Sequence, residues 1–464
     1  MGTTGAMSSA RDPSSADDRL LQAIESARSS RFYARHLAGC EIRSRADLPG
    51  LPRTSRDQVR AAGAEELLVV PPAEAGLPLE FVDGDGVRFS AWCGAQDLRK
   101  MADYARGLVP ELAQEPSLLS RFSSASPVAL VLQAALGADA AQRPAAEAPA
   151  SAVSYDEAVA LLQRREPEAL ACAPLEPLML AEAARAQGIA GHDPFASIEV
   201  VFCSGAPLPA ALRERIESDL GARVVEFYGS DESLLLGASC EQGHLHLATD
   251  LLEFEILDPR TWEPVPPGGR GVVTVTSLVH AVMPLVRFVT GDMVEIANQP
   301  CACGRPGFPV SYLGRCEEQI EIGGRVAMPF DVLDAAHRFA AELGTRIFLA
   351  LLRPNDVRIL VEVEDPSVSI PTRAYLDLRR RVGLPLDVEL VGPNEILDRS
   401  VLLRSSPLPA TSFIGDWRGA GPRVVSMTET VAEGSSHLAG NLFDRARRQL
   451  SAVRRRRRLE RDPA

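Results

Sequence analysis

The sequence contains one lysine, Lys100, although lysine and arginine together number 49 of its 464 residues. A mechanism that needs a lysine amine therefore has one candidate, because the wide arginine guanidinium does not replace a compact ammonium group. No apolar run approaches the roughly 20 residues that span a bilayer. The first residues also lack the apolar segment of a secretory signal. We therefore expect a cytoplasmic protein with no membrane partner.

The chain also lacks an excess of basic charge. Its formal net charge of −13 argues against a general nucleic-acid binder, so we expect no nucleic-acid partner. The run Arg454–Arg458 is a local exception in a polar segment, and we interpret it as a solvated end of the chain. Nothing in the sequence suggests disulfide bonds, and five of the 8 cysteines are scattered, namely Cys40, Cys93, Cys172, Cys203 and Cys316.

The length of the chain predicts two or three domains rather than one core. We expect a disordered tail over residues 1–18, a large domain over 19–314 and a small mobile lid over 315–418. Residues 419–464 are predicted to be a polar, arginine-rich tail. The Ala/Pro-rich stretch 115–155 is expected to include a flexible connection.

Strands and helices alternate in the middle of the chain, which predicts an α/β fold with a parallel sheet covered by helices on both faces. Shorter β segments with turn signals follow over 253–296, and the lid begins another α/β pattern. Near the N-terminus, Thr54 or Ser55 is expected to cap a helix that starts near Arg56. The expected elements are helices 155–164, 177–187, 209–219 and 372–382, and strands 197–203 and 222–227.

Four motifs occur in one order along the chain. They are FCSGAPLP (202–209), EFYGSDES (226–233), PLVRFVTGDM (284–293) and LGRCEEQIEIGGRVAMP (313–329). In this order and spacing they resemble the adenylate-forming (AMP-binding) superfamily, in its phenylacetate–CoA ligase-like branch. The resemblance implies a large N-terminal AMP-binding domain and a small C-terminal lid. It also implies an enzyme that couples a small carboxylic acid to AMP with ATP and Mg²⁺. The acyl group then passes to a thiol of CoA or of a carrier protein.

The same resemblance implies roles for individual residues. Glu232 matches the catalytic carboxylate that holds Mg²⁺, for which oxygen ligands are required. Tyr228 matches the aromatic residue that stacks on adenine, and Asp292 matches the acid that binds the ribose hydroxyls. Arg315 matches a catalytic basic residue near the hinge. The further matches to nucleotide-binding positions are Ser204, Gly205, Ala206, Gly229 and Arg287. Taken alone, TGDM is also compatible with a plain β-turn and Arg315 with a surface charge.

Three departures from the family pattern concern the phosphates. The Ser/Thr/Gly-rich loop that cradles the outer phosphates of ATP is replaced by VDGDGVRF, with Asp83 and Asp85. The stretch 404–418 lacks the lysine that the family carries at the end of its lid. Asp231 replaces a hydroxyl residue before Glu232 and would repel phosphate. Because cationic donors in a transition state are worth about 10²–10³ in rate each, we expect adenylation from ATP to be impaired.

Cysteine and histidine residues form a second constellation, at positions where members of this branch carry metal ligands. Cys301 and Cys303 form a Cys-x-Cys pair, and Cys240 and His246 supply the second pair, with His244 as an alternative. Two pairs of thiolate and imidazole ligands suit a tetrahedral structural Zn²⁺. The alternative is a chance grouping in a β region.

The sequence is compatible with three functions. The first is a working acid–thiol ligase. The second is a half-reaction enzyme that uses pre-formed acyl-AMP or acyl-CoA, and the third is a non-catalytic relative that binds a ligand or partner. AMP or an acyl-adenylate is the expected nucleotide, and the identity of the acid is not determined.

Overall fold

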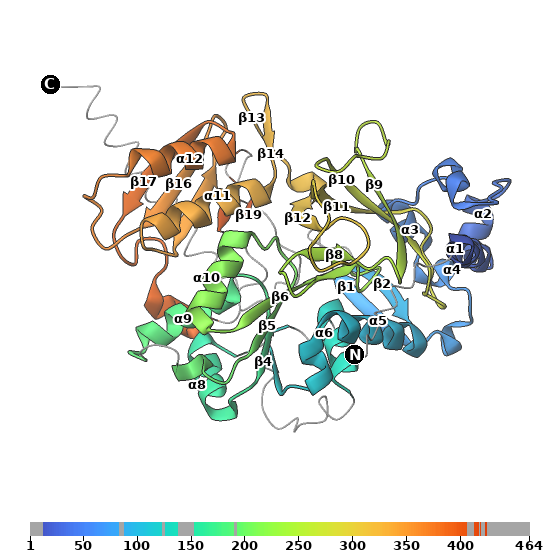
Figure 1. The fold of residues 1–464 in the computed structure, drawn as a ribbon, viewed down its shortest axis with the longest axis horizontal. Coiled ribbons are helices and arrows are strands. Elements are labelled where there is room, and N and C mark those ends of the chain that lie inside the picture. Colours follow the sequence, from blue (N-terminus) through green and yellow to red (C-terminus); the bar gives the residue numbers. More distant parts are fainter. Residues whose placement is uncertain are drawn as a thin grey trace, which may run out of the picture.

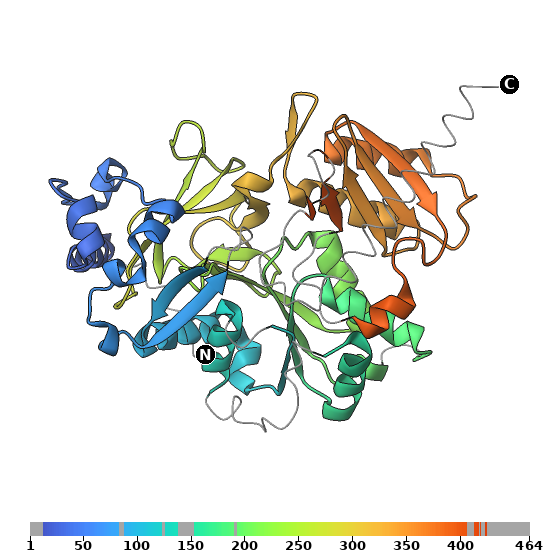
Figure 2. The same cartoon turned by 180° about the vertical axis from the view of Figure 1, so that it is seen from behind.

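The computed structural model of this chain describes residues 13–82, 88–122, 126–137, 153–189, 193–405, 413–416, 418 and 423–424. The large domain extends from α1 to β12, and the lid extends from α11 to β19 (Figure 1). In both views the N-terminal helices lie at the end of the molecule opposite the lid (Figure 2). The predicted α/β class and its division into a large domain and a small lid are confirmed.

Short helices open the large domain, and the capping of α3 follows the sequence prediction. The Ser55 hydroxyl accepts a hydrogen bond from the Gln58 N–H, and the Gln58 side chain accepts one from the Ser55 N–H. This reciprocal capping fixes the start of α3 at Arg56. The helices are α1 Pro13–Ala27, α2 Arg31–His36, α3 Arg56–Ala62 and α4 Ala64–Leu67, with 3-10 turns at η1 Arg45–Gly50 and η2 Pro72–Glu74.

An antiparallel hairpin, β1 Leu77–Val82 and β2 Arg88–Cys93, follows these helices, with Val82 opposite Arg88. The next element is α5 Ala95–Leu108, which carries Lys100. A 3-10 turn, η3 Pro110–Gln114, leads from α5 to the main sheet.

The described strands form a ten-stranded sheet in the order β3-β4-β5-β6-β7-β8-β12-β11-β10-β9. Strands β3 to β6 pair in parallel, and the pairs from β6 to β9 are antiparallel. The parallel strands are β3 Leu118–Ser120, β4 Ala169–Cys172, β5 Val200–Cys203 and β6 Arg223–Tyr228. The antiparallel strands are β7 Gly237–Ser239, β8 Leu245–Leu247, β9 Leu252–Leu257, β10 Arg270–Ser277, β11 Phe288–Ile296 and β12 Val310–Arg315.

The parallel part of the sheet has helical connections, as parallel strands require. Every residue of β4 and β5 is buried, which explains why these strands read as continuous apolar runs rather than as alternating patterns. The helices of this region are α6 Pro127–Leu136, α8 Tyr155–Arg165, α9 Glu176–Ala186 and α10 Ala210–Leu220, with the 3-10 turn η4 Asp193–Phe195.

The lid contains a five-stranded sheet in the order β17-β16-β15-β18-β19. A 3-10 turn, η5 Cys316–Glu318, and a hairpin of β13 Ile320–Ile322 and β14 Arg325–Ala327 connect it to the large domain. The lid helices are α11 Pro329–Glu342, α12 Thr372–Val382 and α13 Arg399–Arg404. Its strands are β15 Phe348–Leu352, β16 Val357–Glu362, β17 Leu386–Val391, β18 Ile414–Asp416 and β19 Arg423–Val424.

Two boundaries differ from the sequence prediction. The disordered tail expected over 1–18 is wrong for Pro13–Asp18, which belong to α1, a helix with proline at its first position. Within 115–155 the described residues include β3 and α6, whose N-cap is Ser126, and the flexible connection expected in this stretch stays a prediction. The lid extends beyond 418, since β19 pairs with β18. The rest of the predicted tails, residues 1–12, 419–422 and 425–464, lies outside the described part of the chain, and so do residues 138–152 of the Ala/Pro-rich stretch.

No helix in the described ranges is long and apolar enough to cross a membrane.

Candidate active site

The candidate site lies where the main sheet changes from parallel to antiparallel pairing. Tyr228 ends β6, the last parallel strand, and Ser204 follows the end of β5. Glu232 lies in the turn between β6 and β7. In open α/β sheets, ligands bind beyond the carboxyl ends of the parallel strands.

Tyr228 is fixed by two contacts. Its hydroxyl donates a hydrogen bond of 2.9 Å to Asp292 Oδ2, and its ring stacks on that of Tyr312 with 5.4 Å between centroids. Burial, and then the negative charge of Asp292, raises the pKa of Tyr228 well above its ordinary value. Tyr228 is itself buried, with 5% of its surface exposed.

Asp292 and Arg315 face each other across the β11–β12 pair, where they are register partners. Arg315 Nη1 lies 3.8 Å from Asp292 Oδ1, and Nη2 donates to the Thr290 carbonyl at 3.2 Å. Burial raises the pKa of Asp292, while the charge of Arg315, followed by that of Arg56, acts in the opposite direction. The carboxylate therefore lies in a buried place between two guanidinium groups.

Glu232 is held by Arg56, a residue that the sequence analysis did not assign to the site. Arg56 Nε lies 2.7 Å from Glu232 Oε1, and Nη2 donates to Oε2 at 3.0 Å. The Glu232 side chain is 2% exposed and that of Arg56 is 22% exposed. Both carboxylate oxygens thus face a guanidinium group at the position where the family resemblance places Mg²⁺.

Asp231 adds a second acid beside this pair. Burial, and then the neighbouring Glu232 charge, raises the pKa of Asp231 to about 6, against the attraction of Arg56 and Arg315. The charged form of Asp231 is thus disfavoured first by burial and then by the neighbouring carboxylate of Glu232. A phosphate group entering here would meet that acidic field.

Arg287 is not brought into this group. Its guanidinium forms a two-point ion pair with Glu255 and donates to the carbonyl groups of Pro49 and Leu51. The Thr54 N–H donates to the carbonyl of Arg287, and the Thr54 carbonyl accepts from the N–H of Val289 at the start of β11, both at 2.9 Å. Arg287 therefore holds the segment that leads into α3 and so helps to place Arg56.

The glycine and serine residues near Tyr228 have local backbone roles. A Cβ atom on Gly229 would lie 2.0 Å from the Leu234 carbonyl oxygen, so the turn after β6 excludes any side chain there. Gly205 has a φ of +91°, a conformation that favours glycine. Ser204 is buried, and its N–H donates to Cys172. Ala206, the third residue of the predicted adenine wall, follows in the same turn.

The two segments expected to handle the outer phosphates are only partly described. Residues 83–87, including Asp83 and Asp85, lie outside the described part, and so do residues 406–412. In the stretch 404–418, which lacks the family's lysine, Arg418 makes a two-point contact with Asp416 at 2.8 and 3.0 Å. Its guanidinium is thus engaged within the lid.

The predicted metal-ligand set does come together. The ligand atoms of Cys240, His246, Cys301 and Cys303 all lie within 4.8 Å of one another. Cys240 Sγ is 3.7 Å from Cys301 Sγ, and Cys303 Sγ is 3.4 Å from His246 Nε2. His244 Nδ1 lies 3.2 Å from Cys301 Sγ, so the alternative ligand is also close.

Comparisons with known proteins agree with this architecture. Residues 137–283 match the family described as AMP-binding enzyme. The phenylacetate-coenzyme A ligase of Thermus thermophilus is 32% identical over 190 residues, which are 40% of this chain and 42% of that protein. The similarity thus covers about two-fifths of the length of that relative.

Solved structures resemble the chain over a longer range. A 2-hydroxyisobutyryl-CoA ligase in its postadenylation state has a TM-score of 0.72 at 20% identity, covering 90% of this chain and 94% of that one. The same enzyme in its thioesterification state has a TM-score of 0.59 at 22% identity, covering 89% and 91%. The chain thus has the α/β fold with a C-terminal lid of these ligases, and its residues 137–283 match the AMP-binding family.

Arg56 and Tyr312 are the residues of the site that sequence reasoning missed. Arg56 lies 176 residues before Glu232, and nothing in its helix-start context indicates a partner that far away. Tyr312 immediately precedes the LGRC motif, and its place on β12 beside β11 was the available signal.

Proposed function

We propose that this chain binds AMP or an acyl-adenylate and transfers the acyl group of a small carboxylic acid to a thiol such as CoA. Adenylation from ATP is impaired in this proposal. The match of residues 137–283 to the AMP-binding family and the similarity to a phenylacetate-coenzyme A ligase support the reaction class. The named relatives are ligases of phenylacetate and 2-hydroxyisobutyrate, so an aryl or a short hydroxy acid is the substrate class to test first.

One observation carries the nucleotide preference. Asp292, which the resemblance assigns to the ribose, contacts both Tyr228 and Arg315, whereas Glu232, which it assigns to Mg²⁺, is paired with Arg56. A Mg²⁺ ion on Glu232 would lie beside a guanidinium group, and the two cations repel each other. Mg²⁺ also demands near-ideal octahedral oxygen geometry. This arrangement does not fit a Mg²⁺ site unless Arg56 moves away.

The charge balance supports the same preference. AMP places one phosphate in the site and ATP places three, while Asp231 and Glu232 contribute two acidic side chains. Arg56 and Arg315 are the basic groups that act on Asp231. Two guanidinium groups offset a single phosphate better than a triphosphate, so AMP is the nucleotide that this field favours.

Two assays with purified protein test the proposal. The first supplies ATP, Mg²⁺ and a panel of aryl and short hydroxy acids, and measures pyrophosphate release. The second supplies the synthetic acyl-AMP of each acid together with CoA, and measures thioester. We expect little pyrophosphate and measurable thioester, with Asp292→Ala as the control that reduces the thioester signal. Robust pyrophosphate release would contradict the impairment, and absence of thioester from folded protein would favour the non-catalytic alternative.

We further propose a structural Zn²⁺ bound by Cys240, His246, Cys301 and Cys303. Tetrahedral ligands at about 2.0–2.3 Å from zinc lie about 3.3–3.8 Å apart. The separations of 3.7 Å and 3.4 Å within the set support this geometry. The ion would join the β7–β8 turn to the loop between β11 and β12, and it has no part in the acyl chemistry.

A further inference from the structure

We infer that the solvent-facing side of α12, in the lid, is a docking surface for an acidic carrier protein that presents the acceptor thiol to the acyl-adenylate. This α12 face consists of Arg373, Leu376, Arg379 and Arg380. The transfer step rests on the proposed function, whereas the docking surface is testable by binding alone.

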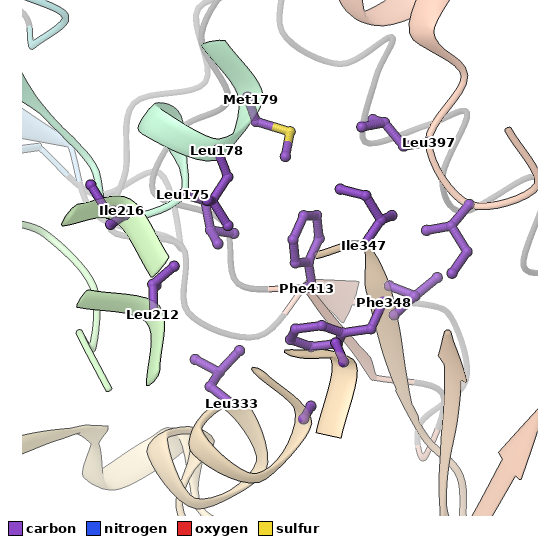
Figure 3. Packing of buried hydrophobic residues seen from close by; sticks show 14 of the residues in the cluster. Leu175, Leu178, Met179, Leu212, Ile216, Leu333, Ile347, Phe348, Leu397 and Phe413 are labelled. Carbon is purple, nitrogen blue, oxygen red and sulfur yellow. The ribbon is translucent and has the colours of Figure 1, made fainter. Parts of the chain in front are cut away.

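One side of α12 is fixed in the core of the lid. Ala374, Leu378 and Val382 belong to a buried apolar cluster that also contains Phe348 and Phe413, two of the side chains in Figure 3. Burial of this side leaves the opposite side of the helix facing solvent, because residues three or four apart share one side of a helix.

The α12 face has an apolar residue at its centre. Among the large apolar side chains of the described ranges, Leu376 is the most exposed, at 55%. Arg373 lies three residues before it, and Arg379 and Arg380 lie three and four residues after it, so all three are its neighbours on the helix surface. All three arginines are exposed. An apolar centre with arginine around it has the composition of a protein–protein contact.

The charge of α12 is opposite to that of the whole chain. The helix contains four arginines and one acid, Asp377, whereas the chain has a formal net charge of −13. Arg380 and Arg381 both pair with Asp377. Within the described residues, the guanidinium groups of Arg373 and Arg379 take part in no ion pair. The net charge of the chain repels an acidic partner and α12 attracts it, so this pattern sets where and how such a partner binds.

The shape of the α12 face favours a protein over a small anion or a nucleic acid. The side of an exposed helix is convex, whereas small ligands bind in concave pockets. Nucleic acids bind mainly through their phosphates, which give no favourable contact to Leu376. A carrier protein offers acidic and apolar side chains together.

The end of α12 contacts the segment that leads from the candidate active site into the lid. Arg325 of the β13–β14 hairpin donates to the Gly383 carbonyl, directly after α12, at 3.2 Å. Figure 1 shows this hairpin beside α12, and it follows Arg315 closely in the chain. In the transfer, the thiol sulfur of the docked partner attacks the acyl carbon of the acyl-adenylate. A C–S bond forms, the C–O bond to the phosphate of AMP breaks, and AMP and a proton are released.

Binding of a labelled acidic acyl carrier protein in its apo form, measured by fluorescence anisotropy, tests docking without transfer. We expect saturable binding that weakens as salt rises from about 0.05 M to about 0.5 M, since salt screens exposed charges. The double variant Arg373→Glu/Arg379→Glu should bind at least about tenfold more weakly. Leu376→Ser should bind at least about threefold more weakly. Arg43→Glu reverses an 83% exposed arginine of the large domain and should bind like the wild type.

Three binding results would overturn the inference. They are no binding by the wild type, an equal loss in Arg43→Glu and in the double variant, and equally tight binding of a labelled DNA duplex. The last result would identify a general anion-binding surface rather than a protein contact.

Thioester formation separates the docking surface from the proposed function. With synthetic acyl-AMP, the wild type should acylate both the holo carrier protein and free CoA. The double variant should lose at least about tenfold in kcat/KM with the holo carrier protein and keep its kcat/KM with CoA. Equal losses with both acceptors would contradict the docking surface. If neither acceptor is acylated by the wild type, the proposed function is wrong, and the anisotropy measurement still decides whether the surface binds the carrier protein.

Discussion

Arg56 and Glu232 form a two-point ion pair between the first turn of α3 and the turn after β6, with a shortest separation of 2.7 Å. The pair links the N-terminal segment to the turn that carries the Tyr-Gly motif. It places a guanidinium group where the family resemblance expects a metal ion. The proposed preference for AMP over ATP depends on this ion pair.

Removal of Arg56 should leave a buried carboxylate without its partner. We expect Arg56→Gln to lower the free energy of unfolding by roughly 2–3 kcal/mol, below the range for fully buried pairs because Arg56 is 22% exposed. Millimolar Mg²⁺ should restore part of this loss in the variant and have no effect on the wild type. Urea unfolding with and without Mg²⁺ checks both statements. Arg43→Gln, which breaks an exposed pair with Glu41, is the control. Equal Mg²⁺ effects on all three proteins would contradict the explanation.

Asp292 should contribute to AMP binding through charged hydrogen bonds to the ribose. We expect Asp292→Ala to weaken AMP binding by about 1.5–3 kcal/mol, the range for hydrogen bonds to charged groups. Tyr228→Phe removes the hydrogen bond of 2.9 Å to Asp292. We expect it to weaken AMP binding by about 0.5–1.5 kcal/mol. Calorimetry with AMP measures both. Unchanged affinity in Asp292→Ala would show that the ribose binds elsewhere.

The motif-bearing strands and helices could be predicted because their patterns are local. The α3 cap needed only Ser55 and Gln58, and β6 ended at the Tyr-Gly step as its apolar run indicated. The proposed zinc ligands could also be predicted, because Cys240 and His246 are close in sequence and so are Cys301 and Cys303. These features depend on neighbours within a few residues.

Other features depend on residues that are far apart in the chain. The Arg56–Glu232 pair spans 176 residues, and Arg287 differs from its motif-based role because it binds the 49–51 segment and Glu255. The apolar contacts of α9 with the lid likewise join distant parts of the chain, because Leu178 and Phe348 lie in one buried cluster. Long-range pairing of this kind leaves no spacing signal in one sequence.

Zinc should be present at one ion per chain in protein purified without chelator. Elemental analysis tests this, and Cys301→Ser should reduce zinc to well below one ion because a thiolate ligand is lost. Cys40→Ser, outside the ligand set, should keep the zinc content of the wild type. Absence of zinc from folded wild-type protein would contradict the proposal.

Glu226 predicts a specific dependence of stability on pH. Burial raises the pKa of Glu226 from 4.5 to about 7, against the attraction of Arg213. Because the folded-state pKa is the higher one, the stability contributed by the protonated group is fully present below pH 4.5. It is lost as the pH rises through about 7.

The comparison with Glu226→Gln isolates this effect. The stability of the wild type relative to the variant should fall between pH 4.5 and pH 7. The fall should be at most about 3 kcal/mol, since a tenfold change in proton affinity is worth about 1.4 kcal/mol. Urea unfolding of both proteins at several pH values provides the measurement. A difference that stays constant over this range, or that rises with pH, would contradict the assignment.

Calorimetric titration of the wild-type protein with AMP and, separately, with ATP in excess Mg²⁺ tests the central claim most directly. The assembled adenosine side and the Arg56-bound Glu232 predict that AMP binds at least about tenfold more tightly, a difference of about 1.4 kcal/mol. Mg-ATP binding that equals or exceeds AMP binding would contradict the account.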